Sequence, residues 1–368
     1  MQLFEYKPTT NHSTIQRKQE AAACAGSVMI WTGLLVGMVL GFVIQRGRFC
    51  TVSLVRESVL KRPVALYGVG IIVLIHTVGV HAFAAFDLIS LAEISFQPIS
   101  AVIGGLLFGV GMIVAGFCPA TLWVRSGEGI ITAWAGIATF MLGVEAAKSG
   151  LLASLYEKLR NYETSYSFAY ETLGVSSWWL VATLAAACLV WVSYALTRPS
   201  PKPFVMAPHY TGLRHWLFEA RWHPALTATL IGLAAVLAWP LAELSGRTSG
   251  VAFSGPSGNL LALLLSGKPK LHWGILFVVG VMLGGGIAAG GAGEFRWRVG
   301  DARALLSAML GGLAMGVGSA IASGCVIGHC IINASLFLWQ GIVAGIAIIV
   351  GATITVWLLY RTPSAKRN

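Results

Sequence analysis

Long apolar runs separated by short polar segments dominate the pattern of hydrophobic and polar positions along this chain. Several runs approach 20 residues, the length at which an α-helix crosses a hydrocarbon core of roughly 30 Å. The pattern predicts an all-α polytopic membrane protein. About nine transmembrane helices are expected, at residues 28–45, 64–86, 99–123, 130–151, 176–197, 224–243, 273–292, 304–332 and 336–360. Two shorter segments with interrupting glycines, 45–60 and 249–266, are predicted as re-entrant half-helices.

Part of the chain occurs twice. Residues 104–118 read GGLLFGVGMIVAGFC and residues 311–325 read GGLAMGVGSAIASGC, aligned without a gap at an offset of 207. The loops at equivalent positions differ in charge, because 87–97 contains no Lys or Arg whereas 294–303 contains three arginines. Lys and Arg favour cytoplasmic loops. Opposite charge at equivalent positions therefore predicts two pseudo-symmetric repeats of inverted topology.

These features predict one transmembrane transport domain at 28–360, after a polar N-terminal segment at 1–27. Its parts are repeat one (28–151), a connecting helix (176–197), a basic cytoplasmic linker (198–223) and repeat two (224–360), followed by a cytoplasmic tail (361–368). Nine crossings with a cytoplasmic C-terminus place the N-terminus in the periplasm. Residues 1–27 lack an apolar core, so we expect no cleavable signal peptide.

Composition supports the membrane class and narrows the partners. The 368 residues are 56% hydrophobic and only 11% charged, against about 25% charged in soluble domains. The net charge of +11 comes from basic residues between apolar runs. Such residues indicate topology anchors and attraction for an anion, and they do not indicate nucleic-acid binding. The six cysteines lie mostly inside apolar segments, so no extracellular disulfide framework is expected.

Two of these cysteines close the repeated stretch. Pro119 follows Cys118 and Gly324 precedes Cys325. Glycine and proline interrupt the helical hydrogen-bond ladder, which leaves backbone amides free to donate to an anion. A thiol is a weak donor with a soft sulfur, so the combination favours a soft, sulfur-bearing anion. The simpler interpretation, a small apolar packing residue, is kept for the cysteines without this context, Cys24 and Cys188.

Other residues near the thiols are candidates for supporting roles. Arginines near two of the cysteines either attract an anion or snorkel to the interface. The supporting set is Arg46, Arg48, Gly116, Pro119, Arg125, Glu128, Gly324, His329, Cys330 and Ser257, which the repeat offset places opposite Cys50. Cys325, His329 and Cys330 are closely spaced, but Cys-x3-His-Cys is not a usual structural-zinc spacing and no second CxxC occurs. We therefore expect no metal and no cofactor.

Three motifs carry a family resemblance: QRGRFC at 45–50, GVGMIVAGFCPATLWVRSGEG at 109–129 and GVGSAIASGCVIGHC at 316–330. They resemble the YeeE/YedE family of inner-membrane proteins, over about residues 28–360. The resemblance implies thiosulfate uptake from periplasm to cytoplasm across a bacterial inner membrane, with a soluble TusA-like sulfur carrier as partner. It also implies that one cysteine per motif handles the ion in turn, namely Cys50, Cys118 and Cys325. Phe117, where the family pattern has glycine, and the extra thiol of Cys330 are departures from that pattern.

Two alternatives remain open from the sequence. One is transport of another sulfur compound or a selenium compound. The other is a membrane-embedded thiol sulfurtransferase, which would need a base beside a thiol. Only His329 is placed that way in the sequence, and no cofactor motif occurs. We therefore expect a transporter and not an enzyme.

Overall fold

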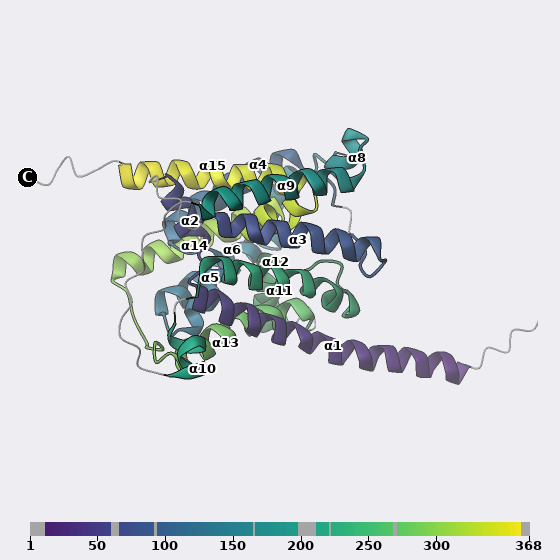
Figure 1. The fold of residues 1–368 in the computed structure, drawn as a ribbon, viewed down its shortest axis with the longest axis horizontal. Coiled ribbons are helices and arrows are strands. Elements are labelled where there is room, and N and C mark those ends of the chain that lie inside the picture. The colour runs from purple at the N-terminus through teal and green to yellow at the C-terminus, as the bar shows by residue number, and fades with distance from the viewer. Residues whose placement is uncertain are drawn as a thin grey trace, which may run out of the picture.

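The computed structural model describes residues 12–59, 66–91, 94–164, 166–197, 211–220, 222–267 and 271–361. Most of the helices run along one common direction (Figure 1). In chain order they are α1 (His12–Gly47), α2 (Thr51–Val59), α3 (Tyr67–Ala85), α4 (Pro98–Ala115), α5 (Pro119–Gly127), α6 (Ile131–Lys148), α7 (Ala153–Arg160), α8 (Ala169–Leu173), α9 (Ser177–Leu196), α10 (Gly212–Arg214), the π-helix η1 (His215–Glu219), α11 (Pro224–Leu244), α12 (Ser254–Ser266), α13 (Trp273–Gly291), α14 (Ala302–Ala322), the π-helix η2 (Gly328–Asn333) and α15 (Trp339–Arg361). Only isolated β-bridges accompany the helices in these ranges, so the all-α prediction is confirmed.

The number of crossings also agrees with the sequence. Eight helical segments in the described ranges are long and apolar enough to span a membrane. The bent pair α6 and α7, with 67° between its helices, makes a ninth when it is counted as one span. Each of the nine coincides with a predicted crossing. The polytopic membrane fold is therefore confirmed.

Two crossings are interrupted where the sequence placed a cysteine next to proline or glycine. The predicted span 99–123 divides into α4 and α5, and the predicted span 304–332 divides into α14 and a second helical piece that contains η2. The two predicted half-helices are present as α2 and α12, with 9 and 13 residues. Their depth in the bilayer stays a prediction.

The helices recur in the same order along the chain. The order α1, α2, α3, α4, α5, α6 returns as α11, α12, α13, α14, η2, α15. Packing is reciprocal as well: α1 packs against α13 and α11 against α3, while α6 packs against α14 and α15 against α4. Figure 1 shows α1 starting at one end of the bundle and α15 stopping at the other. This arrangement supports the predicted repeat.

The crossing of α4 and α14 explains the repeated glycines. A Cβ atom at Gly104 would meet the backbone of Gly318, and one at Gly111 would meet the backbone of Gly311. The early part of α4 therefore faces the late part of α14, which makes the two helices antiparallel. Small residues let helix backbones approach closely within a membrane. Antiparallel packing of equivalent helices is the geometry that an inverted repeat requires.

Some predicted features lie outside the described residues. These are residues 1–11, most of the basic linker (198–210 and 221) and the tail at 362–368. The Cys24 side chain is likewise outside the described part of the structure.

The inverted topology predicts that the loops after α3 and α13 lie on opposite sides of the membrane. Leu88 and Val299 are 57% and 70% exposed, so each tolerates an engineered thiol near the predicted positions. We expect an impermeant thiol reagent added outside to label Leu88→Cys and to miss Val299→Cys, after subtraction of the signal from the unmodified chain. Equal labelling of both variants contradicts the inverted repeat.

Candidate functional site

Three cysteines occupy the same backbone geometry at three places in the fold. Two residues before each one, a helix ends on a residue of positive φ, with values of 49° at Arg48, 74° at Gly116 and 68° at Ser323. Left-handed residues of this kind are common helix stops. A new helical segment then starts directly after Cys50, Cys118 and Cys325.

Each cysteine caps the helix that follows it. The carbonyl oxygens of Cys50, Cys118 and Cys325 accept hydrogen bonds from the amides four residues later, at 3.1, 2.8 and 2.8 Å. The first amides of such a helix have no partner within it, and they carry partial positive charge. Each thiol thus stands where a helix favours a negative charge.

Strained backbone accompanies two of the three stops. Arg48 and Ser323 adopt the left-handed conformation without being glycine, which costs roughly 1–2 kcal/mol per residue. Such strain concentrates at functional sites. Gly47, the glycine of the QRGRFC motif, is needed for close packing and not for the helix stop, because a Cβ at this position would collide with the side chain of Thr227.

The Cys118 thiol is the centre of a small polar cluster. Its side chain is 1% exposed. The Thr121 hydroxyl lies 3.3 Å from the Cys118 sulfur and accepts from the Cys118 amide at 2.9 Å. Pro119 is the first residue of α5, where the missing N–H of proline has no cost. Cys118 is thereby held rigidly at the break.

Cys325 has the equivalent surroundings in the second half of the chain. It is also 1% exposed, and a Cβ atom at Gly328 would meet its sulfur at 3.9 Å. Gly328 is the position that the repeat offset pairs with Thr121. Gly328 therefore lies beside the Cys325 sulfur as Thr121 lies beside that of Cys118.

The thiols form a connected series. Cys118 lies within electrostatic range of Cys50, and Cys325 lies within that range of Cys118. Cys330 is the next neighbour of Cys325, and its thiol points to the Gly345 carbonyl at 3.7 Å. Cys188 lies apart, on α9. The structure therefore brings together the three predicted cysteines and the extra fourth one.

Two chambers adjoin this series. The first, here called the apolar chamber, is a small cavity of about 20 Å³ lined mainly by aliphatic and aromatic side chains, with Cys118, Thr51 and Thr121 as its polar members. The second, the polar chamber, is a small cavity of about 20 Å³ with Cys50 in its lining. Its lining is Ile44, Gln45, Arg48, Phe49, Cys50, Thr121, Val124, Arg125 and Glu128. Ile44, Phe49 and Thr121 belong to both chambers.

The arginines of the polar chamber are already paired with carboxylates. Arg48 binds Glu294 at 2.9 Å, and Arg125 binds Glu128 at 2.7 Å. The amide of Gln45 donates to the other oxygen of Glu294 at 3.0 Å. The third predicted arginine, Arg46, is 5% exposed and donates to a carbonyl oxygen of the segment before α11, that of Ala220, at 3.0 Å. An anion in the polar chamber therefore meets arginines whose positive charge is already partly neutralised.

Two of the predicted supporting residues are buried in the packed interior of the protein. Ser257 accepts from the Trp123 indole at 3.0 Å and donates to the Phe253 carbonyl at 2.6 Å. It is fully buried and lines neither chamber, although the repeat offset pairs it with Cys50. His329 is also fully buried, and its ring packs against Gly324 at the second break. The described residues contain no group of three or more His, Cys, Asp or Glu side chains that could hold a metal ion.

The departure at Phe117 does not narrow either chamber. Phe117 packs against the apolar core and is absent from both linings. The unpredicted residues of the site include Glu294, Phe49, Thr51 and Thr121. Phe49, Thr51 and Thr121 stand within three residues of a cysteine, a signal that the sequence did contain. Glu294 is 246 positions from Arg48, and no local pattern pairs the two.

Comparison with known proteins identifies the relatives of this chain. A family model described as "Sulphur transport" matches residues 46–354. The chain is 39% identical over 340 residues to "Thiosulfate transporter TsuA" of Escherichia coli strain K12, covering 92% of this chain and 97% of the relative. It is 31% identical over 350 residues to "Thiosulfate transporter TsuA" of Spirochaeta thermophila, covering 90% of this chain and 100% of the relative.

The burial of the thiols predicts an order of reactivity in the folded protein. Cys50 is partly exposed, whereas Cys118 and Cys325 are buried. We expect a charged maleimide to modify Cys50 about tenfold faster or more, because reaction at a buried thiol first requires local opening of the structure. Peptide mapping by mass spectrometry measures the three rates in one sample, and unfolding in detergent should equalise them. Equal rates in the folded protein contradict the geometry of the site.

Proposed function

This chain belongs to the sulphur-transport family, YeeE/YedE, and on that premise we propose that it carries thiosulfate from the periplasm to the cytoplasm across a bacterial inner membrane. The observation that carries the proposal is the series of thiols at helix starts. Thiosulfate has a soft terminal sulfur and a hard sulfonate end. A thiol donates weakly to the soft sulfur, while helix amides donate to the oxygens.

The order of the thiols suggests the route of the ion. Cys50 directly follows α1, and α1 stops at the same end of the bundle as α15 (Figure 1). The predicted cytoplasmic C-terminus makes this end cytoplasmic and places the start of α1 outside. A thiosulfate ion then meets Cys325 before Cys118 and Cys50 last. A TusA-like sulfur carrier would receive the ion at the cytoplasmic end.

The paired arginines favour release at that end. A free buried arginine would retain a dianion, whereas Arg48 and Arg125 share their charge with Glu294 and Glu128. Binding there stays weak because each guanidinium already has a carboxylate partner. Transport needs sites that bind the ion without trapping it.

Replacing each thiol of the series tests the route. Changing Cys50, Cys118 or Cys325 to Ala should abolish growth on thiosulfate and lower uptake into vesicles by about tenfold or more, since a hydrogen bond to a charged group contributes about 1.5–3 kcal/mol. Cys188→Ala, on the separate helix α9, is the matched control and should transport normally. Uptake of thiosulfate labelled at both sulfurs measures whether the ion arrives intact.

Two results would contradict this proposal in different ways. Normal uptake by folded Cys118→Ala and Cys325→Ala protein rules out the thiol route while leaving transport in place. Arrival of only one of the two labelled sulfurs shows sulfur transfer instead of transport.

The soft character of the site predicts its selectivity. Sulfate presents only hard oxygens to the thiols and must lose tightly held water, so we expect it to compete of order a hundredfold less well than thiosulfate. Anions with a soft terminal sulfur or selenium should compete better than sulfate. Competition assays with labelled thiosulfate measure both. Sulfate competing at parity would show that charge alone sets the selectivity.

A further inference from the structure

The two chambers meet at a wall that is predominantly apolar. Ile44, Phe49 and Thr121 are the residues common to both linings. The Thr121 hydroxyl is already committed to Cys118, from whose amide it accepts at 2.9 Å and to whose carbonyl it donates at 2.9 Å. The wall therefore presents mainly the Phe49 ring and the Ile44 side chain to anything that passes.

Polarity changes sharply across this wall. On one side lie Arg48, Arg125 and Glu128 with the Cys50 thiol. On the other side, Cys118 and Thr51 are the polar residues beyond the wall itself, and the rest of the lining is apolar. A hydrated anion is stable in the polar chamber. It must lose water to enter the apolar one, and this dehydration costs free energy unless new donors replace the water.

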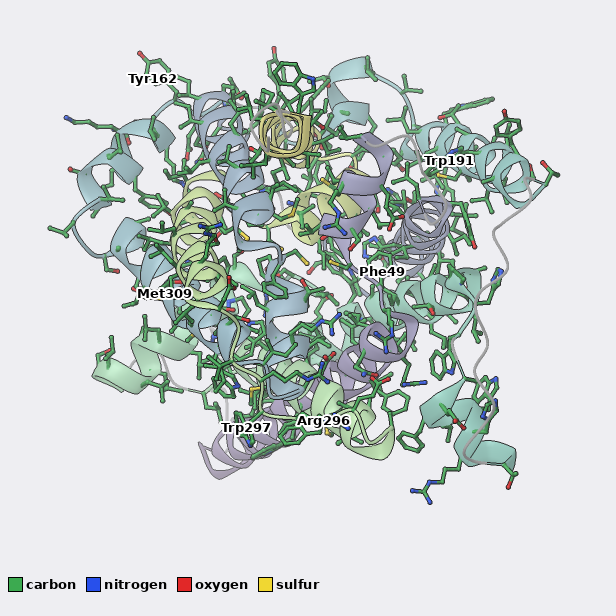
Figure 2. The ribbon with its side chains drawn as sticks, turned by 90° about the vertical axis from the view of Figure 1, so that its left-hand side faces the viewer. Phe49, Tyr162, Trp191, Arg296, Trp297 and Met309 are labelled. Atoms are coloured by element: carbon green, nitrogen blue, oxygen red, sulfur yellow. The ribbon has the colours of Figure 1, made fainter. Side chains whose placement is uncertain are left out.

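The backbone holds Phe49 firmly in this wall. The left-handed Arg48 ends α1, and the Phe49 amide donates to the Ile44 carbonyl at 3.1 Å. Cys50 then caps α2. Phe49 is thus fixed between two helix ends, and its partly buried side chain packs against the apolar core. Seen along the bundle from the end where α15 stops, Phe49 lies among the helices near the middle, while Trp191 and Met309 lie further out (Figure 2).

We propose that Phe49 is a hydrophobic seal between the Cys50 and Cys118 chambers, and that it determines which anions cross. The ring excludes hydrated anions when no substrate is present. It turns aside only for an ion that the Cys118 thiol can hold after dehydration. Hydrophobic constrictions of this kind block ions because water withdraws from them. The proposal rests on the transport function proposed above and adds the element that makes transport selective.

Thiol accessibility tests the seal without relying on transport. A negatively charged, membrane-impermeant methanethiosulfonate reagent is applied to inverted vesicles, at the Cys50 end, and the modified cysteines are mapped by mass spectrometry. In the unmodified chain Cys50 should react and Cys118 should be protected. In Phe49→Ala, the Cys118 rate should rise by about tenfold or more, since the apolar constriction is lost. Phe49→Leu, which keeps an apolar side chain, should stay close to the unmodified chain.

Phe42 provides the matched control. It lies on α1, seven residues earlier, and its ring contacts Phe218 and Trp222 at centroid distances of 5.8 and 6.1 Å. It lines neither chamber. Phe42→Ala should therefore leave Cys118 protected. An unchanged Cys50 rate in each variant shows that the entrance is still folded, and Phe49→Val replaces Phe49→Ala if the latter does not fold.

Flux measurements complete the test. In proteoliposomes, Phe49→Ala should pass sulfate about tenfold faster than the unmodified chain does, while still passing thiosulfate. Protected Cys118 in folded Phe49→Ala protein overturns the seal, and so does an unchanged sulfate flux. Failure of the unmodified chain to carry thiosulfate would instead refute the proposed function, and the Cys118 labelling would still report on the seal.

Discussion

The hydrogen-bonding demand of the backbone inside a membrane governs this structure. A helix in lipid satisfies its own amides and carbonyls, and any interruption leaves groups that only protein or a water-lined cavity can accommodate. The chain has interruptions of the same form before Cys50, Cys118 and Cys325. Each one creates a helix start whose first amides have no partner within the helix. The surrounding helices bury these starts together, and the thiols are brought into one series as a result.

Glycine makes that burial possible. At Gly104, Gly111, Gly311 and Gly318, α4 and α14 approach until no Cβ atom would fit between their backbones. The breaks at Gly116 and Ser323 directly follow these helices. A larger residue at the crossing would push apart the two helices that lead to Cys118 and Cys325. The close packing of these two helices therefore also sets how far apart the two thiols lie.

The arginines that line the polar chamber are each paired with a carboxylate. Glu294 on the loop after α13 holds both Arg48 and Gln45, and Glu128 holds Arg125. These pairs surround the polar chamber, while the apolar chamber beside it contains no charged lining residue. On the proposed route, an anion exchanges the soft environment of the apolar chamber for the ionic one of the polar chamber. The Phe49 ring lies at the boundary where this exchange takes place.

The sequence by itself determined the membrane class, the positions of the crossings, the breaks and the thiols, because these follow from local composition and helix chemistry. It also predicted the repeat, since aligned glycines and cysteines need no structure to be seen. Only the tertiary structure decided which partners meet. The pairing of Arg48 with Glu294 spans 246 positions, and Ser257 became a buried partner of Trp123 despite its offset to Cys50. Such contacts depend on how helices far apart in the chain pack side by side, and no local pattern encodes that packing.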